Sequence, residues 1–311
     1  MLENINRGEL RQRIGKTLNE ITVGLADSGS TTTLVDAELI DPLESAEFYQ
    51  GAWVWMIEEF GAIPIAWSER RVSVYTPAAG TLTFSREWPG VRNNAMTYEI
   101  HRLIRPSVLN DIIGQAIKRL TYEITQEIVV VDGQRQYDLS AVCEDTDDTV
   151  WFTDPAQALE VYWRDGDAGE HIYYPLEWWD VMLIDGVPTL MVPPYSATSS
   201  AKLVLHAWRT YRDFADESTA QDVHVDWLEA LCLAMAYEHL MRHGPAQDTE
   251  RYQRQMLAEY TRYAQLRKAY APRPRYRQHL PPGARQGLNS LIVRWGVGET
   301  CQNRTAPMTL C

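Results

Sequence analysis

Two histidines are the residues whose spacing comes nearest to a metal site. His239 and His243 stand four positions apart on an expected helix, which puts both imidazoles on one face. That arrangement is half of a zinc site, but no acidic base or third ligand accompanies it at the spacing the motif needs. We therefore expect the pair to lie at a helix end or an interface and expect no metal.

An acidic run in the middle of the chain could offer oxygen ligands to calcium. It contains Asp145, Asp147, Asp148 and Asp154. The run lacks the glycine and the terminal glutamate of the EF-hand loop, so a solvated loop is the simpler interpretation.

Other catalytic signatures are missing from the sequence. It contains no GxxxxGK[ST], no GxSxG and no HExxH, and Gly296-Val297-Gly298 lacks the third glycine of a dinucleotide fingerprint. Trp178-Trp179 could form a carbohydrate platform, although core or interface packing is the commoner role of such rings. We expect a protein that is not an enzyme and has no cofactor.

Charge is divided unevenly along the 311 residues. Residues 251–311 hold 11 Lys and Arg against 2 acidic residues, whereas residues 1–250 hold 18 basic and 40 acidic residues. An acidic body repels polyanions, so tight nucleic-acid binding by it is not expected. The basic tail fits an acidic partner surface, a neighbouring copy or a phosphate backbone, or is simply solvated.

Apolar spacing predicts helices at both ends and in the centre. Leu10, Ile14 and Leu18 indicate a short helix over about 7–19. Pro106 opens a second helix, continuing to about 122, whose apolar stripe has helical spacing. The stripe comprises Leu109, Ile112, Ile113, Ala116, Ile117 and Leu120. In the last third, Gly244-Pro245 separates two helices that form an antiparallel hairpin over 222–270.

Alternation and turn residues predict β structure between these helices. Strands are expected at 31–35, 53–57, 70–75, 81–84 and 96–101, with residues 76–80 making a hairpin. In the middle segment, Asp132-Gly133 and Asp185-Gly186 each lie between apolar runs and indicate hairpins, and strands at 159–163 and 171–174 flank another turn.

The expected fold is α+β. It is a helical bundle, built from the N-terminal helix, the central helix and the C-terminal helical hairpin, with inserted antiparallel β modules and an extended C-terminal arm. The expected divisions are 1–30 (helix and connector), 31–105 (β module), 106–126 (central helix), 127–212 (second β-rich domain), 222–270 (helical hairpin) and 271–311 (basic arm). No run of about 18 apolar residues occurs, and the polar first ten residues do not look like a secretory signal.

The order of turns and strands resembles a module of tailed-bacteriophage structural proteins. The resemblance rests on the segments 31–36, 51–54, 70–75, 80–84 and 98–102, followed by the helix from Pro106. The C-terminal helical pair running into a basic tail is similar to head-to-tail adaptor (neck) proteins. The β-rich segment 127–211 departs from small helical adaptors.

The resemblance implies a virion structural protein assembled in the host cytoplasm. It would form a homo-oligomeric ring, expected to be a dodecamer, beneath the portal protein and above tail or nozzle proteins. Genomic DNA would pass through without specific binding, and no membrane partner is implied.

We expect the portal contact to use residues of the last helix and the arm, and a tail or neighbour contact to use the 75–81 hairpin. The portal set is Tyr263, Arg267, Tyr270, Arg273, Arg275, Tyr276 and Arg277, and the hairpin set is Tyr75, Pro77 and Thr81. A tail or baseplate component and a carbohydrate-binding protein remain the alternatives.

Overall fold

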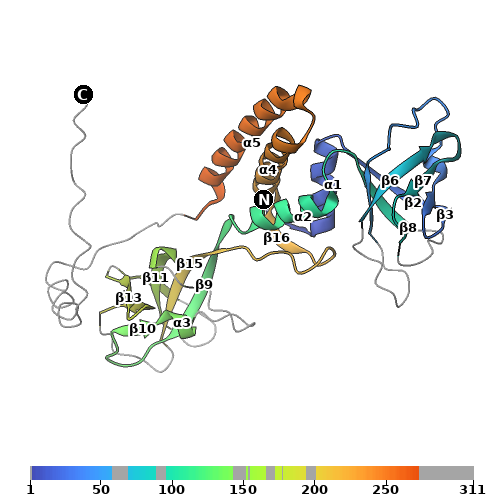
Figure 1. Cartoon of the computed structure of the whole chain (residues 1–311). Helices are drawn as coiled ribbons and strands as arrows, with labels where there is room; N and C mark the ends of the chain where they lie inside the picture. Colours follow the sequence, from blue (N-terminus) through green and yellow to red (C-terminus); the bar gives the residue numbers. More distant parts are fainter. Residues whose placement is uncertain are drawn as a thin grey trace, which may run out of the picture. The chain divides into compact units, whose positions relative to one another are not determined.

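The computed structural model describes residues 2–57, 69–88, 96–142, 152, 155–165, 172–176, 178–193 and 201–272. It divides into two compact units (Figure 1). The first is formed by residues 1–121 and 210–271, and the second is built around the continuous segment 122–209.

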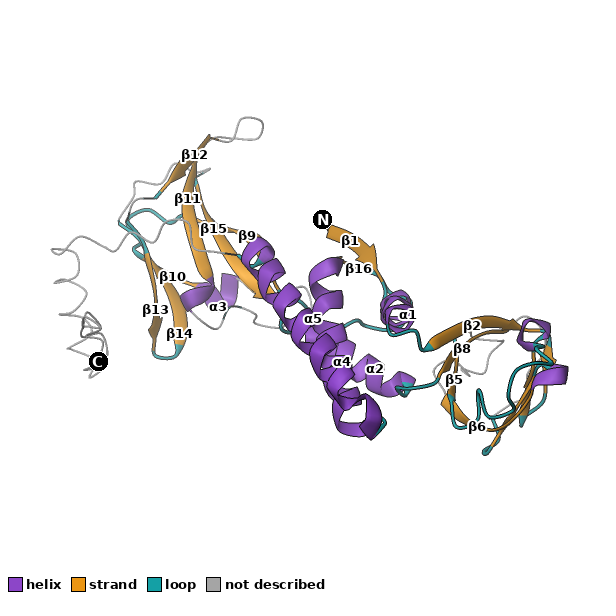
Figure 2. Ribbon diagram, turned by 90° about the horizontal axis from the view of Figure 1, so that it is seen from above, coloured by secondary structure: helices purple, strands orange, loops and turns teal. Residues whose placement is uncertain are grey.

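The first unit contains a curved antiparallel sheet with the strand order β2-β8-β5-β6-β7-β4-β3. Its strands are β2 (Ile21–Ala26), β3 (Ser28–Gly29), β4 (Thr33–Val35), β5 (Trp53–Met56), β6 (Glu69–Thr76), β7 (Thr81–Phe84) and β8 (Met96–His101). The two edge strands, β2 and β3, are separated only by Asp27, whose amide donates to the Val35 carbonyl at 2.9 Å. The sheet therefore curls until its edges meet at Asp27, and we call it the barrel (Figure 2).

Inward-facing side chains fill the barrel. Alternate residues of the strands, among them Leu34, Val54, Leu82 and Ile100, are fully buried in one cluster. Tyr98 spans this core and donates its hydroxyl hydrogen to Asp36 Oδ2 at 2.5 Å. Only glycine fits at position 24, because a Cβ there would lie 2.3 Å from that hydroxyl oxygen.

Helices complete the first unit. They are α1 (Arg7–Thr17), α2 (Pro106–Ile117), α4 (Val225–His243) and α5 (Thr249–Tyr270). Asn6 caps α1 through a reciprocal capping box with Glu9, and Pro106 occupies the first turn of α2. Helices α1, α2 and α4 pack on one another. Strands β1 (Leu2–Ile5) and β16 (Gln221–His224) form a two-stranded sheet beside them.

The second unit has two antiparallel sheets that share one core. The four-stranded sheet has the order β12-β11-β15-β9, and the three-stranded sheet has the order β10-β14-β13. The elements are β9 (Thr121–Val129), β10 (Gln136–Asp138), α3 (Leu139–Val142), β11 (Ala158–Asp165), β12 (Ile172–Pro175), β13 (Asp180–Ile184), β14 (Val187–Met191) and β15 (Lys202–Thr210). Val161 and Leu205 of one sheet and Val181 and Leu190 of the other belong to the same buried cluster.

The expected fold class is wrong. The described part of the chain is a mixed, mostly β-rich protein with several antiparallel sheets, and it is not a helical bundle with inserted β modules. The error arose because the longest periodic segments are helical, whereas strands such as β1, β2 and β16 are short and carry little alternation. The central helix was expected to continue to about 122. Helix α2 ends earlier, at Ile117, and residues 121–129 form a strand.

The expected hairpins fared differently from one another. The pairs β6–β7, β11–β12 and β13–β14 are confirmed, and Asp185 and Gly186 both have positive φ, as a type I′ turn requires. The hairpin expected around Asp132-Gly133 is wrong, because β9 and β10 enter different sheets. The α4–α5 hairpin is confirmed, with its break at Gly244.

Candidate interaction surfaces

The outer helix of the first unit is mostly exposed. Helix α4 buries most of its residues, whereas within α5 Tyr252 alone is fully buried. A helix this long is stable only when packing supports it, and α4 supplies that on one side. The opposite side of α5 carries the exposed residues Arg254, Leu257, Ala258, Thr261, Ala264 and Lys268. Leu257 is 55% exposed at the middle of this row.

The described members of the portal set do not share one environment. The Tyr263 ring stacks on Trp227 with centroids 6.0 Å apart, and the Tyr270 ring stacks on His224 at 4.2 Å. Both rings are half-buried; Tyr263 packs α5 on α4 and Tyr270 packs α5 on the end of β16, while Arg267 is exposed. Arg273, Arg275, Tyr276 and Arg277 lie outside the described residues.

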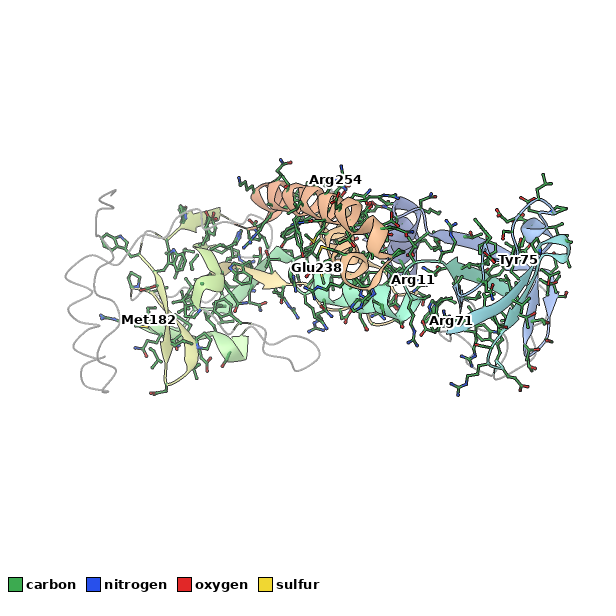
Figure 3. The ribbon with its side chains drawn as sticks, turned by 45° about the horizontal axis from the view of Figure 1, so that its top comes forward. Arg11, Arg71, Tyr75, Met182, Glu238 and Arg254 are labelled. Atoms are coloured by element: carbon green, nitrogen blue, oxygen red, sulfur yellow. The ribbon has the colours of Figure 1, made fainter. Side chains whose placement is uncertain are left out.

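At the hairpin between β6 and β7, one member of the expected contact set is unavailable. Tyr75 is 2% exposed, its hydroxyl donates to the Leu39 carbonyl at 2.6 Å, and its ring packs edge-on against Tyr49. Burial raises the pKa of the Tyr75 hydroxyl. Pro77 and Thr81 are half-buried. A partner would therefore meet the turn rather than the ring of Tyr75, which is labelled in Figure 3.

Beside that turn lies a surface that the sequence reading did not single out. The Asp41 amide donates to the Pro77 carbonyl at 3.2 Å, which places the 40–48 loop against the turn. Along this loop Ile40 is 48%, Leu43 97% and Phe48 38% exposed. We call residues 38–48 together with Pro77–Ala79 the barrel-tip surface. Exposed apolar residues gathered in this way are a feature of interaction sites.

Acidic side chains surround the exposed apolar residues of the barrel tip. Residues 17–69 contain ten Asp and Glu and no Lys or Arg. Glu38, Asp41 and Glu47 are exposed and Glu44 is half-buried. The absence of basic residues over this stretch was a signal in the sequence that could have identified the surface.

A buried ionic cluster lies between α1, β8 and the 213–217 segment. Arg11, Glu99 and His101 are fully buried. Arg11 Nε donates to Glu99 Oε2 at 2.7 Å and Nη2 to Oε1 at 3.2 Å, and Nη1 donates to Glu217. His101 Nε2 lies 3.0 Å from Glu99 Oε2, and its Nδ1 lies 3.6 Å from Glu20 Oε1. The Arg11 guanidinium also lies over the Trp55 ring at 5.0 Å.

The surroundings of Glu99 and His101 favour the charged form of each. Burial opposes ionisation of Glu99, but the hydrogen bond with His101 and the charge of Arg11 outweigh it and lower the pKa of Glu99 to about 2. Burial likewise opposes the charge on His101, yet the facing Glu20 carboxylate and the hydrogen-bonded Glu99 raise the pKa of His101 from its ordinary value. These groups are closed to solvent, so the arrangement ties the helices to the barrel and offers no reactive group to a substrate.

The structure adds no support for the other candidate ligand sites, which are the histidine pair, the tryptophan pair and the acidic run. Burial and the neighbouring His243 lower the pKa of His239, and the two rings lie 4.7 Å apart. No group of three or more metal-ligating side chains occurs among the described residues. Trp179 is 2% exposed and belongs to the core of the second unit, which argues against a tryptophan platform. The acidic run at 145–154 lies outside the described residues.

No protein-family model matches the chain, and the curated proteins contain no significant relative of it. Within the described ranges, no helix is both long and apolar enough to cross a bilayer. The comparisons therefore test neither the expected adaptor family nor the expected portal and tail partners.

Proposed function

We propose that this protein is a virion structural protein of the head-to-tail adaptor type, acting through its surfaces and without catalysis. The proposal takes its position in the virion from the resemblance in the strand and turn pattern. The observation that carries an assembly role is α5, a 22-residue helix with Tyr252 as its one fully buried residue. Its exposed row is available to another subunit or to a partner protein.

The exposed row of α5 suits helix packing between proteins. Leu257 supplies apolar area, and Ala258, Thr261 and Ala264 are small enough to let a second helix approach closely. Arg254, at one end of the row, favours an acidic partner. In the proposed assembly, copies pack side by side around an axis, and Arg267 and the segment after Ala271 face the portal.

The acidic composition of residues 1–250 supports a conduit role. Like charge lowers affinity for phosphate, so DNA would pass such a ring without being held. The proposed partners are the portal protein, tail or nozzle proteins and further copies of the same chain.

Negative-stain imaging of the purified protein, alone and mixed with a candidate portal ring, tests this proposal. We expect a ring, or a collar added to the portal. Truncation after Ala271 removes the basic segment and should abolish portal binding with an unchanged thermal unfolding midpoint. A monomer that ignores the portal, or a truncated chain that still binds it, would contradict the proposal; attachment only at the far end of a tail would favour the tail or baseplate alternative.

A further inference from the structure

We propose that the barrel-tip surface receives residues 285–311 from a second copy of the chain. The inference rests on the proposed self-assembly and names one of the contacts that would hold neighbouring subunits together. It begins from Leu43, whose side chain is 97% exposed on a loop anchored at its start by a backbone hydrogen bond to Pro77.

Apolar exposure at the barrel tip calls for an apolar partner. Ile40 is about half exposed and Leu43 is almost wholly exposed. Phe48 contacts Arg102 on one side of its ring, with the guanidinium carbon 4.8 Å from the ring centroid. Each exposed apolar group gains about 25 cal/mol per Å² when a partner covers it. Residues 285–311 contain such a partner in Leu291-Ile292-Val293 and Trp295, a run of β-branched, apolar and aromatic residues.

Charge is complementary in the same two segments. The barrel tip presents Glu38, Asp41, Glu44 and Glu47, while residues 285–311 carry three arginines against one acid, Glu299. Arg294 stands between Val293 and Trp295, so an arginine accompanies the apolar run in the same way that acids surround Leu43. Arginine pairs with carboxylates through two parallel hydrogen bonds, which adds geometric specificity.

A donated segment also fits the symmetry of a ring. A subunit that gives a segment on one side and receives one on the other makes a heterologous contact, and repetition of that contact closes a ring. The described chain ends at Pro272, and the residues before 285 provide a tether of up to about 3.3 Å per residue. Residues 273–277, expected at the portal, remain outside this contact.

Cross-linking between two distinguishable chains tests the inference. Both chains carry Cys143→Ser, and Cys232 is fully buried. One chain is truncated after Ala284, which removes Cys301 and Cys311, and carries Leu43→Cys; the other is full length and keeps Cys301 and Cys311. Mixed and treated with a short bis-maleimide, they should give a heterodimer through Cys301 or Cys311. A matched truncated chain with Leu183→Cys, also at an exposed leucine, should link at least tenfold less.

Charge reversal supplies the second arm of the experiment. Adding Glu38→Lys and Glu47→Lys to the Leu43→Cys chain should reduce the heterodimer at least tenfold, whereas Asp111→Lys and Glu250→Lys, with the same change in net charge, should not. Equal linking at positions 43 and 183 would overturn the inference. So would a link within a full-length Leu43→Cys chain without any in the mixture, because the segment would then bind its own copy.

The test separates this inference from the proposed function. A chain truncated after Ala284 keeps residues 273–277, so its binding to a portal reports on the adaptor role alone. Heterodimer formation without portal binding would support the contact between copies and contradict the adaptor function. Portal binding without the heterodimer would support the adaptor function and contradict the contact between copies.

Discussion

At the scale of single residues, Arg11 is the side chain whose loss should matter most. It is the cation that Glu99 and Glu217 share in a fully buried setting. Removing one partner of a buried ion pair leaves an unpaired charge away from water, which costs far more than the pair contributes when intact.

We expect Arg11→Met to lower the free energy of unfolding by about 3–5 kcal/mol. Urea denaturation followed by tryptophan fluorescence measures this. Arg13→Met is the matched control on the same helix, because Arg13 pairs with Glu3 where both side chains are largely exposed. Similar losses in the free energy of unfolding for the two variants would show that burial of the Arg11 ion pairs does not set the cost of removing them.

The buried cluster also makes stability depend on pH in two directions. Because the pKa of His101 is raised in the folded state, its contribution is complete below about 6.5 and is lost as the pH rises through the folded pKa. Because the pKa of Glu99 is lowered from 4.5 to about 2, its contribution is present above 4.5 and is lost as the pH falls toward 2. We therefore expect stability to decline on both sides of a maximum.

NMR titration of the His101 imidazole, together with urea denaturation at several pH values, measures both effects. His101→Gln should flatten the decline on the alkaline side and also weaken the decline on the acid side, because the hydrogen bond with His101 is part of what lowers the pKa of Glu99. An imidazole that titrates at or below 6.5 would contradict the assigned charge state.

At the scale of elements, the turn between β6 and β7 depends on a glycine. Gly80 has φ +54°, and a Cβ there would lie 2.1 Å from the Asp36 carbonyl oxygen. This contact is with backbone, which cannot move aside without shifting the 36–41 segment and with it the barrel tip.

We expect Gly80→Ala to destabilise the barrel by more than the about 1–2 kcal/mol that a left-handed conformation alone costs. Gly51→Ala is the control in the same unit, because Gly51 has φ +85° but a Cβ would meet only the flexible Arg71 side chain at 3.4 Å. Thermal unfolding of both variants gives the comparison. A loss at Gly80 no greater than that at Gly51 would mean that the turn relaxes freely.

The outer helix leads to a prediction that separates stability from assembly. Leu257→Glu changes an exposed side chain of α5, so the free energy of unfolding should stay within about 0.5 kcal/mol of wild type while self-association is lost. Tyr252→Ala, at the buried position of the same helix, should instead lower stability. Analytical ultracentrifugation and thermal unfolding distinguish the two, and a Leu257→Glu protein that still assembles would remove α5 from the contact.

At the scale of the whole molecule, the second unit is an insertion in the first. The chain leaves the first unit after Thr121 and returns at Thr210, and the flanking strands β9 and β15 are neighbours in one sheet. The Tyr211 amide donates to the Leu120 carbonyl at 3.1 Å, so the two ends of the insertion lie side by side.

We expect residues 122–209 to fold alone, and the rest of the chain to fold when a two-glycine linker replaces them. Each piece keeps its own buried cluster, which is what independent folding requires. Cooperative urea transitions of the two pieces check this. A broad, non-cooperative transition in either piece would show that the units depend on each other.

Particular residues show how far the sequence could be read. Asp185-Gly186 specified its hairpin locally, because both residues tolerate the positive φ of the turn, and Gly244-Pro245 ended α4 for equally local reasons. Asp132-Gly133 looked the same but joins strands of two sheets, since partner choice depends on distant strands. Tyr75 alternated like a surface hairpin residue, and only the Leu39 carbonyl and the Tyr49 ring made it a core residue.

The sequence by itself determined the helical hairpin, the strand pairs β6–β7 and β13–β14 and the separation of charge between body and tail, because each depends on near neighbours or on composition. The tertiary structure alone decided that the described part of the chain is a mixed, β-rich fold, that β2 and β3 meet at Asp27 to close the barrel, and that Arg11 lies buried against Glu99. Contacts between residues far apart in the chain set these features. These features depend on which surfaces can be buried together. That is decided by the whole fold and not by any single segment.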